Sequence, residues 1–177
     1  TGQTTYTYDG AGNLRSKTQS SGQQANFDYD LANRLSHARV ADNVIDYHWQ
    51  TGALKDHLRM VQDPTGTQTS HYNDAGKLTR FTRSVGQRRY TTEYHYNKYG
   101  QLTGKTLPGG QTLAYQITRH GQLTAINQRQ GWLRQPTPIL TGLNPNTRSL
   151  THGNGVTTEH HYRNKRLAAI TIGDLHQ

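Results

Sequence analysis

One short pattern recurs along this sequence: an aromatic residue, a polar stretch of about five residues and a leucine. The clearest copy reads YTYDGAGNL, from Tyr6 to Leu14. Residues 27–35, 70–78 and 94–102 repeat it as FDYDLANRL, SHYNDAGKL and YHYNKYGQL, and 115–123 give the looser YQITRHGQL. Shortened copies occupy 47–54 and 160–167, and the stretch 139–150 is interpreted as one further degenerate copy. Seven or eight copies predict a single repeat region over residues 1–177, in which each unit buries its apolar side against its neighbours.

The spacing within a copy predicts a β-hairpin. Tyr8 and Leu14 lie six residues apart, and a second large residue, Tyr6, lies two positions before the first. This alternation is typical of a strand with one buried face. A loop of five residues then places the aromatic residue opposite the leucine, as a cross-strand pair. We expect such pairs to anchor the repeats at Tyr8–Leu14, Tyr29–Leu35, Trp49–Leu54, Tyr72–Leu78, Tyr96–Leu102, Ile117–Leu123 and Tyr162–Leu167.

The loops carry residues suited to tight turns. An aspartate follows the aromatic anchor in two copies, and glycine or asparagine, which tolerate a positive φ, comes three positions later. The repeat-turn positions expected on this basis are Asp9, Gly12, Asp30, Asn33, Gly76, Gly100 and Gly121. Second strands are predicted from each leucine onward, and motifs such as Asp63-Pro64-Thr65-Gly66 are predicted to turn the chain between hairpins.

No segment keeps a helical period, so the predicted fold class is all-β: an array of antiparallel hairpins in a curved or spiralling sheet. An irregular segment is expected near residues 128–148, around Trp132. Hydrophobic residues make up 31% of the chain, and adding the 18 glycines gives about 41%, below the roughly 45–50% of globular proteins. This composition favours a thin sheet over a compact core, and the eleven tyrosines argue against disorder.

The copies resemble the tyrosine–aspartate (YD) repeat family, also called Rhs repeats, whose pattern is Tyr-Asp-x-x-Gly-Arg-Leu followed by a threonine-rich strand. Asp9 and Asp30 match the aspartate, whereas Asn73 and Asn97 replace it. The resemblance implies a sheet that spirals into a hollow shell, as in bacterial Rhs proteins, Tc toxin C components and teneurins. In the bacterial members it implies an enclosed toxic domain released by self-cleavage at an Asp-Pro motif. The one Asp-Pro of this chain, Asp63-Pro64, is instead interpreted as a turn.

Other chemistries find less support in the residues. Adjacent strand residues such as His160 and His161 point to opposite faces, which disfavours a shared zinc ion. One acid per loop is too few for calcium, and turn bonding by the loop aspartates Asp9, Asp30 and Asp74 is the favoured interpretation. No cysteine and no Gly-x-Ser-x-Gly motif is present. We therefore predict neither a cofactor nor an enzymatic activity.

The sequence carries a net charge of +9, which permits a polyanionic partner. Arg88 and Arg89 form its tightest basic pair. The leading hypothesis is a structural encapsulation module of a secreted bacterial toxin, whose partners are further shell repeats and the enclosed toxin domain. The alternative is a surface module that binds an acidic glycan. No stretch is long and apolar enough for a membrane span, and the unpaired edges of the outer hairpins predict self-association.

Overall fold

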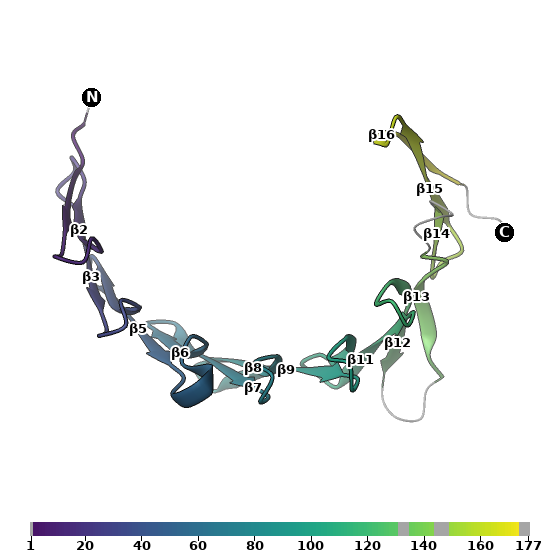
Figure 1. The fold of residues 1–177 in the computed structure, drawn as a ribbon, viewed down its shortest axis with the longest axis horizontal. Coiled ribbons are helices and arrows are strands. Elements are labelled where there is room, and N and C mark those ends of the chain that lie inside the picture. The colour runs from purple at the N-terminus through teal and green to yellow at the C-terminus, as the bar shows by residue number, and fades with distance from the viewer. Residues whose placement is uncertain (1, 131–134, 144–148, 174–177) are drawn as a thin grey trace. The chain divides into compact units, whose positions relative to one another are not determined.

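The computed structural model describes residues 2–130, 135–143 and 149–173 of the chain. The chain divides into two compact units, residues 1–91 and 92–177, and each is considered by itself. Both consist of short antiparallel strands joined by tight turns (Figure 1). Whether the two units act as the single repeat region expected from the sequence stays a prediction.

The first unit holds four consecutive hairpins. Its strands are β1 (Thr5–Tyr8), β2 (Leu14–Thr18), β3 (Gln24–Tyr29), β4 (Leu35–Val40), β5 (Asn43–Trp49), β6 (Leu58–Asp63), β7 (Gly66–Tyr72) and β8 (Leu78–Val85). The only helix among the described residues is a single 3-10 turn, η1 (Gly52–Leu54), in the loop between β5 and β6.

The second unit continues the same construction, with β9 beginning just before the division. Its strands are β9 (Arg88–Tyr96), β10 (Leu102–Thr106), β11 (Gln111–Ile117), β12 (Leu123–Gln130), β13 (Thr137–Thr141), β14 (Ser149–His152), β15 (Thr157–Arg163) and β16 (Arg166–Ile172). Within each unit the strands follow one another in the order of the sequence and pair antiparallel. The predicted all-β class of antiparallel hairpins is thus confirmed.

The register places aromatic residue and leucine opposite each other across the repeat turns. Tyr8 opposes Leu14, and Tyr72 opposes Leu78. The same arrangement holds for Tyr29–Leu35, Tyr96–Leu102, Ile117–Leu123 and Tyr162–Leu167. The Asp63–Gly66 stretch forms the turn between β6 and β7, as its sequence predicts.

The pair expected between Trp49 and Leu54 is wrong. Trp49 opposes Leu58 in the register. Leu54 instead ends η1, whose turn lengthens this loop by one helical turn before the second strand begins. Leu54 lies five residues after Trp49, close to the usual spacing of six, so the sequence of this loop resembles a shortened copy.

The segment near residues 128–148, which the sequence predicts to be irregular, lies partly outside the described residues, at 131–134 and 144–148. Strand β12 extends to Gln130, and β13 lies in the middle of the segment. Within the suspected degenerate copy at 139–150, the described parts contribute to β13 and β14, which pair antiparallel. Trp132 lies outside the described residues.

Burial is shallow throughout the described residues. Ala38 and Ala125 are the only hydrophobic residues classed as buried, at 3% and 6% exposure. The central anchors are half-buried, while Tyr8 near one end of the array is 62% exposed. Single-layer hairpins explain this pattern, because they leave both faces of each strand near solvent. No helix in the described part of the chain is long and apolar enough to cross a membrane.

Candidate functional site

The repeat turns are closed by the residue that follows each anchor. Oδ1 of Asp9 accepts hydrogen bonds from the backbone N–H groups two and four residues further along, at 2.9 and 2.8 Å. Asp30 accepts the equivalent bonds at 2.9 and 3.0 Å. Side-chain hydrogen bonds from Asn13 to Asp9 and from Arg34 to Asp30, followed by these backbone bonds, hold the pKa of both carboxyl groups below its ordinary value. The loop aspartates thus bond their own turns, as in an Asx-turn.

Asparagine performs the same role in two further copies. Oδ1 of Asn73 accepts the two backbone N–H groups at 3.1 and 2.9 Å, and Oδ1 of Asn97 accepts them at 3.0 and 3.1 Å. Asn73, and not its neighbour Asp74, therefore closes the turn of the third regular copy. The amide can replace the carboxylate because the turn needs an acceptor and not a charge.

The residue three positions after this acceptor adopts a left-handed conformation. Its φ is 86° at Gly12, 58° at Asn33, 72° at Gly76, 73° at Gly100 and 81° at Gly121. Glycine and asparagine adopt such angles at the lowest cost. A β-branched residue would be strained at this position.

Each of the seven hairpins that have an anchor pair contains a β-bulge beside it, which the sequence analysis did not predict. The register shifts by one residue between Asp28 and Tyr29, so that Ser36, directly after the leucine, has no partner opposite it. The hydroxyl of Ser36 donates to the carbonyl oxygen of Asp28 at 3.1 Å. Thr79, Thr103 and Thr124 make the equivalent bond at 3.1, 3.1 and 3.0 Å. A bulge disrupts the ladder locally, and here a hydroxyl bonds a carbonyl beside it.

Consecutive hairpins are joined by their anchors. Backbone pairing between β2 and β3 covers only 16–18 of β2, so Leu14 lies beyond the end of the ladder. The hydroxyl of Tyr29, in the following hairpin, donates to the carbonyl of Leu14 at 3.1 Å. We call this contact, from an aromatic anchor to the leucine of the preceding hairpin, the junction bond.

The junction bond recurs at the next two junctions. Nε1 of Trp49 donates to the carbonyl of Leu35 at 2.9 Å, and the hydroxyl of Tyr72 donates to the carbonyl of Leu58 at 3.0 Å. Tyrosine and tryptophan both place an apolar ring between hairpins and carry one polar donor at its far end. This shared chemistry explains why tryptophan can stand in for tyrosine at this position.

Neighbouring turns also contact one another directly. Nδ2 of Asn13 donates to Oδ1 of Asn33 in the next turn at 3.1 Å. Nε2 of His57 lies 3.1 Å from the carbonyl of Gly76, and its ring meets Tyr72 edge-on with centroids 4.8 Å apart. Since a carbonyl only accepts, His57 donates from Nε2.

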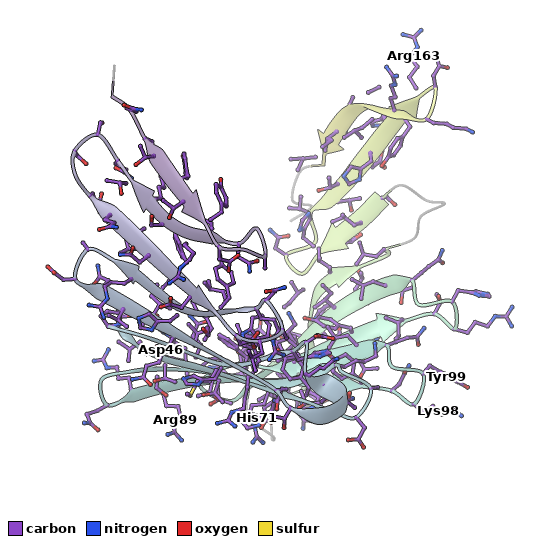
Figure 2. The ribbon with its side chains drawn as sticks, turned by 60° about the vertical axis from the view of Figure 1, so that its left-hand side comes forward. Asp46, His71, Arg89, Lys98, Tyr99 and Arg163 are labelled. Carbon is purple, nitrogen blue, oxygen red and sulfur yellow. The ribbon has the colours of Figure 1, made fainter. Side chains whose placement is uncertain are left out.

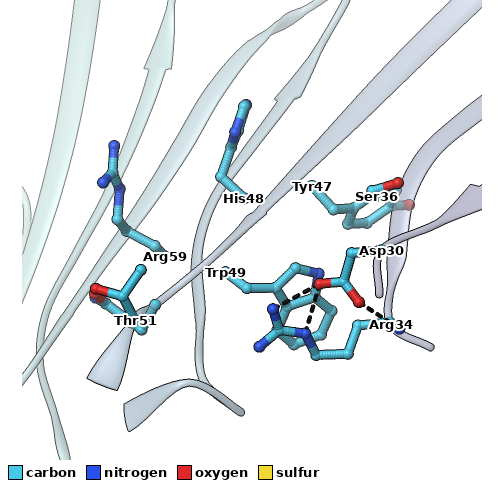
Figure 3. A pocket seen from close by; sticks show the side chains of 9 residues that line it. Asp30, Arg34, Ser36, Tyr47, His48, Trp49, Thr51 and Arg59 are labelled. Carbon is cyan, nitrogen blue, oxygen red and sulfur yellow. Dashed lines mark hydrogen bonds and ion pairs between the residues drawn. The ribbon is translucent and has the colours of Figure 1, made fainter. Parts of the chain in front are cut away.

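A hollow of ≈ 290 Å³ opens beside Trp49 in the first unit (Figure 3). Its lining includes Asp30, Arg34, Trp49 and Arg59. Nε of Arg34 donates to Asp30 at 2.7 Å, its guanidinium lies 5.1 Å from the Trp49 ring centroid, and it also donates to the carbonyl of Lys55. The Arg34 guanidinium, which lies beside the indole, thus links its own turn, at Asp30, to the loop that contains Lys55.

A second charged pair reinforces the turn between β6 and β7. Nη1 and Nη2 of Arg83 donate to Oδ2 and Oδ1 of Asp63 at 3.0 and 3.1 Å. The carboxylate also accepts the hydroxyl and backbone N–H of Thr65, at 2.6 and 2.8 Å. Arg83 and then Thr65 hold the pKa of Asp63 well below its ordinary value.

The other side chains considered for chemistry do not converge. Within the described ranges, no three His, Asp or Glu side chains are grouped as a metal site would require. Nε2 of His161 lies 2.8 Å from the hydroxyl of Thr171 and 3.9 Å from Glu159. Arg88 and Arg89 are both exposed at the start of β9, where consecutive strand residues point to opposite faces. Lys98 and Tyr99 project from their turn (Figure 2), and Tyr99 is 75% exposed.

The repeated geometry agrees with the comparison of the sequence with protein families. Residues 1–134 match the family model described as the teneurin YD-shell. This chain belongs to the teneurin YD-shell family. None of the curated proteins matches it significantly.

Solved structures share the fold of this YD-shell chain at low sequence identity. A crystal structure of TcdB2-TccC3 has a TM-score of 0.78 and 17% identity, covering 96% of this chain and 10% of that one. A Photorhabdus luminescens Tc holotoxin pore with mutated TccC3 has a TM-score of 0.75 and 18% identity, and the match covers 96% of this chain and 10% of that one. TcdB2-TccC3 without its hypervariable C-terminal region has a TM-score of 0.62 and 15% identity, and the match covers 96% of this chain and 11% of that one. The YD-shell chain thus spans about a tenth of the length of these relatives' chains.

Proposed function

We propose that this YD-shell chain is a segment of the wall of a hollow shell, with residues 1–177 acting as one repeat region. The observation that carries the proposal is the junction bond. At three junctions of the first unit, one hairpin offers a leucine carbonyl and the following hairpin offers an aromatic donor, as Tyr29 and Trp49 do. Such a unit can be added repeatedly in one direction, as a wall requires.

The shallow burial supports a wall more than a solid domain. Ala38 and Ala125 alone are buried among the described hydrophobic residues, so the sheet has two accessible faces and no interior of its own. In a shell, one face meets the enclosed volume and the other meets solvent. A scaffold of this kind performs no catalysis, and the proposed role is structural.

By likeness to the Tc toxin components with the same fold, we propose that the shell encloses a toxic polypeptide in a secreted, extracellular bacterial protein. Its further partners are the repeats that pair with β1 and β16, the first and last strands in the described sheet order. The anchors and turn residues described above then serve to keep adjacent hairpins in register.

The test is protease protection in the full-length product of the gene. Trypsin digestion followed by mass spectrometry compares segments outside the repeats in the native protein and in the double variant Tyr29→Ala/Tyr72→Ala. We expect a protected segment in the native protein that becomes cleavable when the two junctions are weakened. Tyr99→Ala, at an exposed turn position, is the matched control. Equal cleavage in the native protein and the double variant rejects the enclosing role.

A second candidate function, binding of an acidic glycan, is favoured by the exposed pair Arg88 and Arg89 and the net charge of +9. Heparin chromatography tests it, because polyanion binding weakens steeply with salt. Arg88→Ala/Arg89→Ala is expected to elute at lower salt than the native chain, whereas Arg163→Ala/Arg166→Ala, which removes the same charge elsewhere, changes elution less. Equal elution of the two double variants reduces the interaction to net charge alone.

A further inference from the structure

The junction between β10 and β11 departs from the others in one residue. Its register matches theirs: backbone pairing covers only 104–106 of β10, and Leu102 lies beyond the end of the ladder. The residue in the anchor position of the following hairpin is Ile117, opposite Leu123. Isoleucine has neither a ring nor a hydrogen-bond donor.

A hollow of ≈ 540 Å³ lies at this junction. Its lining includes Leu102 and Ile117, the two residues of the junction, together with Tyr115, Leu123 and Ile126. Among the described residues no side-chain donor is recorded on the carbonyl of Leu102, whereas Leu14, Leu35 and Leu58 each accept one. The volume is in the range of small-molecule sites, roughly 300–1,000 Å³.

We propose that this hollow is a binding site for a hydroxyaryl group, the ring and hydroxyl of a phenol or a tyrosine side chain. Three other junctions show what fills the equivalent space: an aromatic ring whose polar donor bonds the leucine carbonyl, at 2.9 to 3.1 Å. The chain supplies the apolar walls and the free acceptor here but omits the ring. A ligand that carries the ring and the donor completes the junction.

The surroundings of the site match this chemistry. Burial raises the pKa of the Tyr115 hydroxyl, with Tyr94 adding to the effect, so the wall next to the hollow disfavours a charge. Gln101 and Gly121 line the side nearest the turns, and a Cβ built on Gly121 would lie 3.1 Å from Nε2 of Gln101. This side is therefore closely packed, and a neutral ring suits the apolar side chains that line the rest of the hollow.

The experiment is a methyl NMR titration of the 177-residue chain with p-cresol, toluene and N-acetyltyrosinamide. We expect p-cresol to shift the methyl signals of Leu102, Ile117 and Ile126 with a Kd on the order of 1 mM, as a ring of this size allows. Toluene lacks the donor and is expected to bind roughly threefold to tenfold more weakly. Binding of N-acetyltyrosinamide would identify a polypeptide tyrosine as the source, and binding of p-cresol alone would identify a free phenol.

The decisive variant is Ile117→Tyr, which supplies the ring from the chain itself. It is expected to abolish the p-cresol shifts, whereas Ile170→Tyr, on the exposed strand β16, leaves them unchanged. If Ile117→Tyr does not fold, Ile117→Val provides the second test, because it enlarges the hollow and is expected to retain binding. The proposal is overturned if p-cresol leaves these methyl signals unmoved, if toluene binds equally well, or if folded Ile117→Tyr still binds.

Discussion

The hydroxyl of Tyr72 donates a 3.0 Å hydrogen bond to the carbonyl of Leu58, a residue of the preceding hairpin. The two residues lie beyond the backbone ladder between β6 and β7, which pairs 60–63 with 66–69. At the end of the junction where the strands no longer pair, the Tyr72 side chain therefore supplies a hydrogen bond between the two hairpins in place of a backbone one. The contribution of the junction bond to stability can be measured by replacing tyrosine with phenylalanine, because the two residues differ only in the hydroxyl group that donates it.

Tyr72→Phe is expected to lower the free energy of unfolding by about 1 kcal/mol, the net value of one hydrogen bond. Tyr72→Ala also removes the half-buried ring and is expected to cost more, up to about 3 kcal/mol. Urea unfolding followed by tyrosine and tryptophan fluorescence measures both. The exposed Tyr99 is the control, and Tyr99→Phe is expected to change stability by less than about 0.5 kcal/mol. Equal effects of the two Phe variants would show that the junction bond contributes nothing.

Alanine substitutions at three glycines of the turns distinguish the cost of backbone strain from the cost of a steric clash. Gly12→Ala meets open space but keeps a φ of 86°, so it is expected to cost about 1 kcal/mol from strain alone. At Gly76, with φ 72°, the added Cβ would also lie 2.9 Å from Nε2 of His57, and the cost is expected to be larger. Gly10→Ala has neither conflict and serves as the control. Thermal unfolding orders the three variants, and a smaller cost at Gly76 than at Gly12 would contradict the contact between turns.

The Asp63–Arg83 pair predicts a loss of stability in acid. The folded-state pKa of Asp63 lies well below its ordinary value of 3.8, mainly because Arg83 and Thr65 bond the carboxylate. A lowered pKa contributes stability that is present above the unfolded value and is lost as the pH falls through the folded one. Asp63→Asn should therefore destabilise the chain at pH 7 and flatten the decline in unfolding midpoint below about pH 4. Asp42→Asn, at an exposed turn position, is the control, and an unchanged decline in Asp63→Asn would refute the prediction.

The first and last strands predict self-association. Every residue of β16 is exposed, including Ile170 at 53% and Ile172 at 68%, and an unpaired apolar strand edge is a template for pairing with another chain. Sedimentation velocity of the 177-residue chain is expected to show concentration-dependent association. Ile170→Lys should reduce it, whereas Val85→Lys, at the tip of the β8 strand, should not. A monomer at all concentrations would argue against exposed edges.

Much of the local structure could be predicted from the residues. The spacing of Tyr8 and Leu14 defines a hairpin, and Asp9 with Gly12 defines its turn, because Asx bonding and a positive φ depend on residues within one loop. The expected partner of Trp49 was wrong for a local reason as well: a 3-10 turn ending at Leu54 moved the pairing to Leu58. The number of residues between two anchors does not show how many of them belong to the loop and how many to the strands.

The sequence by itself determined the hairpins, their turns and their order, since each is encoded within about ten neighbouring residues. Only the tertiary structure decided how one hairpin meets the next, through the bond from Tyr29 to Leu14 and the hollow at Ile117. These features depend on the displacement between strands whose partners are 14 or 15 residues apart in the chain. The sequence does not show whether a leucine carbonyl accepts a hydrogen bond from the next hairpin. Only the packed geometry shows which junctions contain an aromatic ring that donates one.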